Sequence, residues 1–322
     1  MSLFEVKDLS KSCSECFGID KISFEIQEKG VYGFFGKSGS GKTLLSMLLV
    51  GICEADSGAI IYKDKDLCES EAKAAQIKRK IGYVPAQSVF PNDMSVEEVL
   101  DFTGMTKKIS PDKRARQIKE ALTLTGLENK AELLVECLTP SEKKRMAYAN
   151  ALIGNTDILI IDEPITAIDS AQRDEIKKLI SMLGKMKVVI LFAKNPTDIE
   201  SLCNYVGILG NGALLVYDSL DAMLAKLNKT VMALLRVKKK GSDVTDIMQT
   251  LRDIDGISGV KKGNSTGLIT DVVLDCSTRD GVQSAVNAKM TELGVDVVSF
   301  KFTTLGISDV MDALCVDGAR EV

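Results

Sequence analysis

The chain has 322 residues, of which 45% are hydrophobic and 27% charged, and its formal net charge is −4. This composition is ordinary for a globular protein of two-domain length, and the absence of a long basic stripe argues against nucleic acid as a partner. The longest apolar runs fall far short of the roughly 18 residues that a membrane-spanning helix needs. The first residues lack the basic and apolar regions of a signal peptide. We therefore expect a cytoplasmic chain that meets a membrane only through a partner.

The chain contains eight cysteines and no histidine. Scattered cysteines are typical of buried thiols in a reducing compartment, and the lack of histidine excludes a Cys₂His₂ zinc site. One pair, Cys13 and Cys16, has C-x-x-C spacing. A redox role for this pair is an alternative to two ordinary thiols near a loop.

The N-terminal part of the chain alternates between strand and helix patterns. Residues 3–9 alternate between apolar and polar side chains, as an edge strand does. Further strands are expected over 22–26, 31–35, 59–62, 81–85, 158–161, 188–192, 205–209 and 213–217. Further helices are expected over 44–50, 70–79, 170–183 and 196–203. Strands that alternate with helices predict a doubly wound α/β domain, to which we assign residues 1–220.

A helical stretch interrupts this alternation between about residues 92 and 153. It begins with a capping box formed by Ser95 and Glu98. A second helix is expected from Pro111 to about Thr125, and a third from about Ser141. The stretch therefore reads as a helical insertion into the α/β domain.

The order of the expected elements changes after about residue 220. Strands are expected over 231–237, 257–261, 268–274 and 295–302, with helices over 244–252 and 281–293. This β-α-β-β-α-β order is the ferredoxin-like arrangement. A last helix is expected over 307–314. We therefore predict a second, small α+β domain over 221–322.

The strongest motif follows the strand expected at 31–35. The eight residues that begin at Gly36 fit the phosphate-binding loop G-x-x-x-x-G-K-[ST], and an apolar helix follows. Glycines let successive backbone N–H groups surround a phosphate chain, and the helix N-terminus adds its positive end. Lys42 is expected to reach the β- and γ-phosphates, and the Thr43 hydroxyl to ligate Mg²⁺; the alternative is a glycine-rich turn without a ligand. The candidate phosphate-binding residues are Gly36, Lys37, Ser38, Gly39, Ser40, Gly41, Lys42 and Thr43.

Two acids end the apolar strand expected at 158–161. Asp162 is suited to hold Mg²⁺ through water, and Glu163 to polarise a water for attack on the γ-phosphate. The simpler alternative is an acidic turn after a strand. The phosphate-binding motif upstream favours the functional interpretation.

With these motifs in this order, the chain resembles the ATP-binding subunit of an ABC transporter along nearly its whole length. The resemblance implies a P-loop NTPase core with a helical subdomain, binding ATP and Mg²⁺. Gln87 matches the glutamine that touches Mg²⁺ and water beside the membrane partner. Residues 138–142 occupy the slot of the LSGGQ signature, where Thr139 and Ser141 would contact nucleotide, and Asp169 belongs to the D-loop slot. The family pairs two such domains head to tail, so we expect a homodimer or a heterodimer acting on a separate membrane permease.

Several positions depart from the family pattern. In the signature slot Pro140 lacks an N–H, Ser141 replaces a glycine, and Glu142 replaces a glutamine. Lys194 stands where the family has its switch histidine, and lysine can donate to a γ-phosphate only as a point charge. Cys13 stands where an aromatic residue stacks on adenine, although Phe17 lies close in sequence. The D-loop step is Ala167-Ile168 rather than one containing glycine.

Residues 229–322 resemble the appended domain of ATPases from the drug- and antibiotic-export branch of the family. Asp309 and Val310 match the tail of that branch, whereas Gly306 and Ser308 depart from it. A dimerisation domain is the simpler interpretation of this segment, and a small-molecule sensor is the alternative. The sequence thus predicts an exporter ATPase that lies on the inner face of the membrane through its permease. The rival prediction is a regulatory or degenerate partner subunit that binds nucleotide but hydrolyses little.

Overall fold

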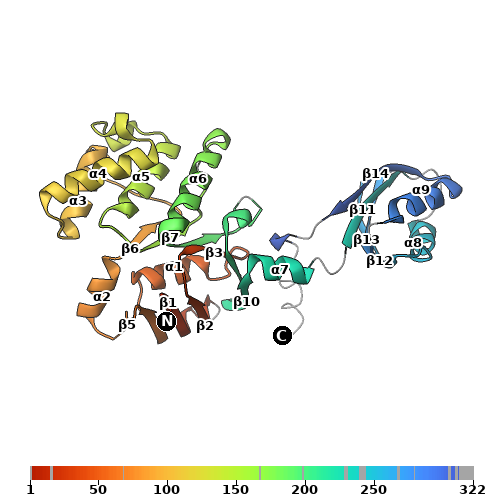
Figure 1. The fold of residues 1–322 in the computed structure, drawn as a ribbon, viewed down its shortest axis with the longest axis horizontal. Coiled ribbons are helices and arrows are strands. Elements are labelled where there is room, and N and C mark those ends of the chain that lie inside the picture. Colours follow the sequence, from red (N-terminus) through yellow and green to blue (C-terminus); the bar gives the residue numbers. More distant parts are fainter. Residues whose placement is uncertain are drawn as a thin grey trace. The chain divides into compact units, whose positions relative to one another are not determined.

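The computed structural model describes residues 2–311 except 15–16, 68, 167, 198, 228–230, 239–243, 267–268, 279, 304–305 and 309–310. The chain folds into two compact units (Figure 1). The first comprises residues 1–220 together with Met311, and the second is Asp221–Val310. The division falls next to the boundary expected after residue 220, but Met311 groups with the first unit and not with the second.

A six-stranded sheet forms the centre of the first unit, in the order β10-β9-β3-β8-β7-β6. Five neighbouring strands run parallel, and β10 pairs antiparallel with β9. Strands β3, β7 and β8 are buried along their whole length, as strands covered on both faces are. Their carboxyl ends share one edge of the sheet, where ligands bind in open α/β sheets. The bounds are β3 Gly30–Phe35, β6 Ile81–Val84, β7 Ile158–Asp162, β8 Val188–Ala193, β9 Tyr205–Gly210 and β10 Ala213–Ser219.

A separate antiparallel sheet, in the order β2-β1-β4-β5, covers the other side of the first helix. Its strands are β1 Phe4–Ser14, β2 Phe17–Ile26, β4 Ser57–Tyr62 and β5 Lys65–Asp66. The prediction of an edge strand at residues 3–9 is wrong, because β1 pairs with β2 on one side and with β4 on the other. Alternation reports that one face of a strand is buried, but not how many neighbours the strand has.

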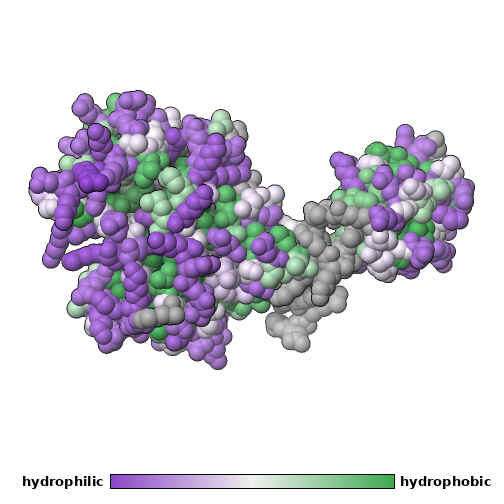
Figure 2. All heavy atoms as spheres, in the orientation of Figure 1, coloured by the Kyte–Doolittle hydropathy of each residue, from purple (hydrophilic) through white to green (hydrophobic). Residues whose placement is uncertain are grey.

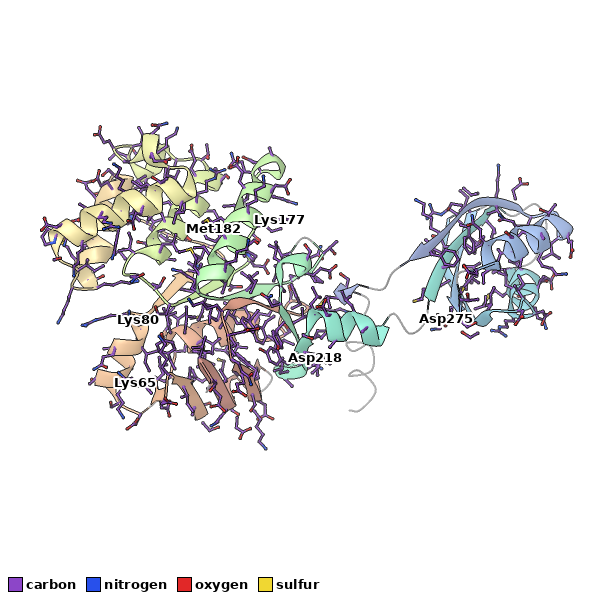
Figure 3. All side chains as sticks on the ribbon, in the orientation of Figure 1. Lys65, Lys80, Lys177, Met182, Asp218 and Asp275 are labelled. Atoms are coloured by element: carbon purple, nitrogen blue, oxygen red, sulfur yellow. The ribbon has the colours of Figure 1, made fainter. Side chains whose placement is uncertain are left out.

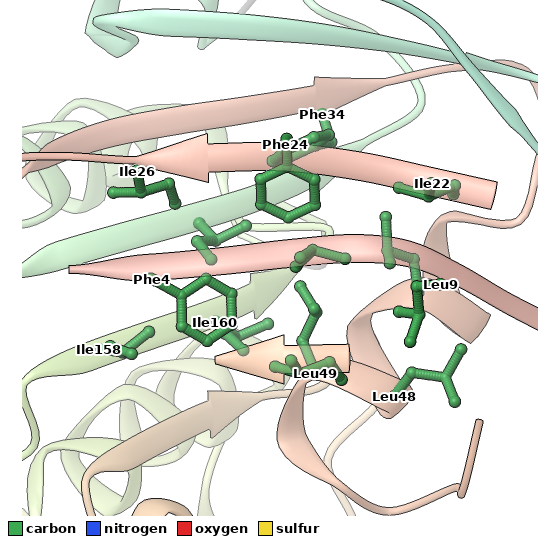
Figure 4. Close-up of a cluster of buried hydrophobic side chains, with 14 of the residues drawn as sticks. Phe4, Leu9, Ile22, Phe24, Ile26, Phe34, Leu48, Leu49, Ile158 and Ile160 are labelled. Carbon is green, nitrogen blue, oxygen red and sulfur yellow. The ribbon is translucent and has the colours of Figure 1, made fainter. Parts of the chain in front are cut away.

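The core of the first unit joins these two sheets through α1 (Lys42–Val50). Figure 4 shows Leu9 of the antiparallel sheet beside Leu48 of α1, and Phe24 of the same sheet beside Phe34 of β3. Residues Ile158 and Ile160 of β7 belong to the same cluster. The helix that follows the glycine loop is therefore fixed by packing on both sides, which makes the loop a rigid platform.

The helical subdomain, expected at 92–153, contains α3 (Val96–Thr106), α4 (Pro111–Thr125) and α5 (Pro140–Leu152). These helices share a hydrophobic cluster of their own, which includes Leu100, Leu122 and Met146. Figure 2 shows mostly hydrophilic side chains over its visible surface. Helix α5 begins one residue earlier than expected, because Pro140 takes the first helical position and Thr139 caps the helix.

Elsewhere the helices differ in part from the predictions. α2 (Glu71–Lys78) and α6 (Ser170–Met186), which carries Lys177 and Met182 (Figure 3), lie where helices were expected. The helix predicted over 196–203 is wrong for the described residues, which contain only the 3₁₀ turn Glu200–Leu202. The Asn195 side chain accepts hydrogen bonds from the N–H and hydroxyl of Thr197, and this local turn competes with helix. Helix α7 (Leu220–Leu227) was not predicted.

The capping box at the start of α3 is confirmed and supplies a test of helix stability. Ser95 Oγ accepts from Glu98 N–H at 3.2 Å, and a Glu98 carboxylate oxygen accepts from Ser95 N–H at 2.7 Å. We expect Ser95→Ala to lower the free energy of unfolding by about 1 kcal/mol, measured by urea denaturation. Ser110, the N-cap of α4, makes no side-chain capping bond, so Ser110→Ala is the matched control. An equal loss in both variants would contradict the role of the box.

The second unit has the predicted ferredoxin-like topology. Its antiparallel strands lie in the order β12-β13-β11-β14, so the first and last strands are neighbours, as the β-α-β-β-α-β arrangement requires. The elements are β11 Val231–Lys238, α8 Val244–Arg252, β12 Ile257–Thr266, β13 Ile269–Cys276, α9 Val282–Glu292 and β14 Asp296–Thr303. Of the helix expected over 307–314, Ile307, Ser308 and Met311 are helical, and the other positions lie outside the described residues.

Candidate nucleotide-binding site

The glycine loop lies between β3 and α1, at the carboxyl edge of the parallel sheet. A Cβ atom at Gly36 would lie 2.4 Å from the Leu209 carbonyl oxygen and 2.5 Å from Ser40 Oγ, so only glycine fits there. Gly41, with a φ of 94°, takes the left-handed conformation that precedes the helix. The loop therefore presents backbone, without side-chain bulk, at the N-terminus of α1.

The Lys42 ammonium is held across this loop. Its Nζ donates to the carbonyl oxygens of Gly36 (2.7 Å) and Lys37 (2.9 Å) and to Ser40 Oγ (3.2 Å). Burial lowers the pKa of Lys42, although the carboxylates of Glu163 and Asp162 oppose this shift. The chain thus holds a partly desolvated cation at the mouth of the loop.

Thr43 and Asp162 connect the loop helix to the end of β7. Thr43 Oγ1 donates to Asp162 Oδ2 at 2.8 Å, across 119 residues of sequence. Asp162 is only 1% exposed, and its Oδ1 has no hydrogen-bond partner in the described part of the chain. Burial raises the pKa of the Asp162 carboxyl, and the bond from Thr43 opposes that shift. A buried carboxylate oxygen without a partner, beside a hydroxyl, fits an oxygen-preferring cation such as Mg²⁺.

Glu163 and Lys194 face the same cavity. Glu163 Oε1 accepts from Lys194 N–H at 3.1 Å, and Oε2 accepts from Thr166 Oγ1 at 3.4 Å. The cavity has a volume of about 180 Å³, and both residues line it together with the glycine loop. Its lining residues are Ser38, Gly39, Gly41, Lys42, Thr43, Leu44, Glu163 and Lys194. The arrangement places cations, backbone donors and a carboxylate around one space.

Other predicted site residues lie outside this cavity lining. Gln87 is exposed in the segment that follows β6, and Asp169 is the exposed N-cap of α6 and makes no side-chain capping bond. Cys13 is exposed on β1. The side chain of Phe17, together with Cys16 and Ala167, falls outside the described residues.

The predicted signature segment is closed by its own capping box. Thr139 donates its N–H (2.9 Å) and its hydroxyl (3.0 Å) to Glu142 Oε2, and Thr139 Oγ1 accepts from Glu142 N–H (3.2 Å). The other Glu142 oxygen lies 3.4 Å from the Lys130 ammonium. The pKa of Glu142 is lowered, and the hydrogen bond from the backbone N–H of Thr139 is the main cause. Ser141 is buried and donates its hydroxyl to Gln172 of α6. The T-x-x-E spacing at 139–142 was a readable sign of this box.

Lys144 is a site residue that the sequence prediction missed. It lies on α5, is 4% exposed, and donates to the carbonyl oxygens of Pro85 (3.0 Å) and Asp162 (3.3 Å). A lysine inside a helix that also carries Lys143 gives no sequence signal of burial. Only the packing of α5 against β6, together with the hydrogen bond from Lys144 to Asp162 at the end of β7, reveals it.

The parallel sheet, the glycine loop before a helix and the acids on a neighbouring strand define a P-loop nucleotide-binding domain. A family model described as "ABC transporter" matches residues 19–166. The molybdate/tungstate import ATP-binding protein WtpC of Methanocaldococcus jannaschii is 32% identical over 72% of this chain and 76% of its own length. The bacitracin transport ATP-binding protein BcrA of Bacillus licheniformis is 24% identical over 96% of this chain and 95% of its own. The chain therefore belongs to the ABC transporter ATP-binding proteins.

A solved structure supports the same fold. A dimeric ATP-binding cassette in a post-hydrolysis state, bound to ADP and Pi, aligns with a TM-score of 0.61 and 21% identity. The alignment covers 67% of this chain and 98% of that one. As a member of the family, the chain is an ATPase subunit of a transporter with ATP and Mg²⁺ as its cofactors, and such subunits dimerise and pair with membrane permease components. None of the helices in the described ranges is long and apolar enough to cross a membrane.

Proposed function

We propose that this chain is the motor subunit of an exporter, which hydrolyses ATP to drive a separate permease from the cytoplasmic face of the membrane. The observation that carries the proposal is the convergence of Lys42, Thr43 and Glu163 around one cavity, with the Asp162 carboxylate bonded to Thr43. Export is supported by the resemblance of residues 229–322 to the drug- and antibiotic-export branch. It is also supported by the alignment with BcrA, which extends over 96% of the chain, whereas that with the importer WtpC covers 72%.

The proposed roles follow from the chemistry of each group. Lys42 and the loop backbone, residues 36–41, bind the phosphates. Thr43, Asp162 and Gln87 are the residues that would hold Mg²⁺, whose contribution is to neutralise charge on the β- and γ-phosphates. Glu163 orients and polarises the attacking water, because its carboxylate is the base that lines the cavity.

Two further groups act on the γ-phosphate side in this proposal. Lys194, which lines the cavity, supplies a positive charge where the family has a histidine. Thr139, Ser141 and Asp169 would reach the nucleotide of a partner subunit in a homodimer or a heterodimer. For Thr139 this requires its hydroxyl to leave the Glu142 carboxylate, and for the buried Ser141 it requires the hydroxyl to leave Gln172.

A groove on the helical subdomain supports contact with a permease. Phe102 and Met105 of α3 are 56% and 50% exposed, and they line this groove beside Glu97 and Asp101. Exposed apolar side chains rimmed by acids suit a basic, amphipathic segment of a partner. The groove begins at Asp93, six residues after Gln87, so such contact would act close to the site.

The capping box at Thr139 favours a second candidate function, a nucleotide-binding subunit with little turnover of its own. Pro140 has no N–H, and the N–H groups of Thr139 and Glu142 are already bonded within the box. The N-terminus of α5 therefore offers few free donors to a phosphate from the partner. Such a subunit would regulate, or pair with, a more active one.

Steady-state ATPase activity, measured beside ATP affinity, separates the two candidates. Lys42→Ala is the blank, because it removes the ammonium at the mouth of the loop. The exporter function is supported if the wild-type protein hydrolyses ATP, Lys42→Ala does not, and the rate of hydrolysis rises when the membrane permease is added. Binding without turnover, both with and without permease, supports the regulatory subunit.

A further inference from the structure

A buried lysine, Lys144, connects three parts of the first unit, and among the described residues no carboxylate lies within hydrogen-bond distance of its ammonium. Its ammonium donates to the Pro85 carbonyl oxygen (3.0 Å) and, more weakly, to that of Ala86 (3.5 Å), in the segment that leads from β6 to Gln87. It also donates to the carbonyl oxygen of Asp162 at 3.3 Å. The side chain itself comes from α5.

The position of this charge is unfavourable for folding alone. Burial lowers the pKa of Lys144 to about 8, although the charges of Asp162 and Glu163 oppose the shift. A buried charge whose hydrogen bonds, within the part of the chain that the structure describes, all go to carbonyl groups is weak evidence of a stability role and points to function.

The carbonyl that Lys144 holds belongs to the peptide unit between Asp162 and Glu163. The N–H of the same peptide unit donates to the Phe192 carbonyl oxygen at 2.8 Å, so both of its polar groups are fixed. Glu163 follows with a φ of 50°, a left-handed conformation that a residue with a Cβ adopts only when its surroundings hold it there. The direction of the Glu163 carboxylate thus depends on how this peptide unit is held.

We propose that Lys144 is a positioning residue for ATP hydrolysis, which fixes the Asp162–Glu163 peptide relative to the Pro85–Ala86 segment and thereby aims the Glu163 carboxylate. This inference rests on the proposed role of Glu163. A shift of the segment before Gln87 would move the ammonium and, through it, the peptide that carries Glu163. Loss of the ammonium should therefore impair the chemical step and spare nucleotide binding.

The test compares Lys144→Met, Lys144→Arg and Lys144→Gln with the wild-type protein. We expect Lys144→Met to lower kcat by about tenfold or more and to change the ATP dissociation constant by less than about twofold. Lys144→Arg, which keeps a charged donor, should recover kcat to within about threefold of wild type. Lys144→Gln, which keeps one smaller amide donor, should lie between them. If the Met or the Arg variant fails to fold, the kcat of Lys144→Gln is compared with that of the wild type instead.

Lys107 supplies the matched control. It is a partly buried lysine whose pKa, like that of Lys144, burial lowers to about 8, and it donates to the Ile153 carbonyl oxygen at the opposite end of α5, 2.6 Å away. Lys107→Met should lower the urea midpoint and leave kcat within about twofold of wild type. The proposal is overturned if Lys144→Met keeps wild-type kcat, or if Lys144→Met and Lys107→Met lose kcat equally. It is also overturned if Lys144→Gln, used because another Lys144 variant does not fold, keeps wild-type kcat. Absence of Lys42-dependent turnover in the wild type would overturn the proposed function, and the role of Lys144 with it.

Discussion

Glu163→Gln is expected to lower kcat for ATP hydrolysis by on the order of 10²–10³ while ATP affinity stays close to that of wild type. Glutamine keeps the shape of the side chain, and its carbonyl oxygen can still accept the Lys194 N–H that now lies 3.1 Å from Oε1. The substitution removes the negative charge and the basicity that would polarise a water. Steady-state kinetics beside equilibrium binding of ATP measures both quantities.

The control for this variant is an exposed carboxylate away from the cavity. Glu120 on α4 forms a surface pair with Arg116, so Glu120→Gln should leave both kcat and ATP affinity unchanged. If Glu163→Gln hydrolyses ATP at the wild-type rate while Lys42→Ala shows no hydrolysis, Glu163 is not the base. A parallel loss of affinity would show instead that Glu163 acts in binding.

The parts of the site that the sequence could predict are encoded locally. Residues 36–43 bring the glycines, Lys42 and the Thr43 hydroxyl together in one loop and the start of one helix. The apolar run before Asp162 marks a strand buried on both faces. Because parallel strands end at the same edge of a sheet, the two motifs lie together, and Thr43 Oγ1 is 2.8 Å from Asp162 Oδ2. The roles assigned to these residues stay predictions until the variants are measured.

The remaining features depend on contacts between distant segments. Lys144 meets carbonyl groups 59 and 18 positions away, and no local pattern encodes such a contact. The place of β1 in the middle of its sheet depends likewise on pairing with β4. At residues 196–203 the helical pattern was outweighed by the turn that Asn195 forms with Thr197. Local sequence rules thus account for the loop and the strands, and tertiary packing accounts for the peptide geometry behind Glu163.

Mg²⁺ is expected to increase the affinity for ATP, and Asp162→Asn should make this increase smaller. The expected reduction is roughly 10- to 100-fold, equivalent to ~1.4–2.7 kcal/mol. Asparagine can still accept from Thr43, but it replaces the unpartnered Oδ1 with an amide that repels a cation. The measurement is ATP binding with Mg²⁺ and with EDTA. Because burial raises the pKa of Asp162, the carboxylate is disfavoured in the nucleotide-free protein, so we expect no loss in the free energy of unfolding.

Asp157, which directly precedes the first residue of β7, is the control for Asp162. Burial raises its pKa too, but hydrogen bonds from Tyr62 and Lys63 outweigh burial and lower the pKa overall. Asp157→Asn should therefore destabilise the fold and keep the full Mg²⁺-dependent gain in ATP affinity. If Asp162→Asn keeps that gain, Asp162 is not a metal ligand. In that case its buried, unpartnered oxygen would need another explanation, because an uncompensated polar atom is costly unless a ligand completes it.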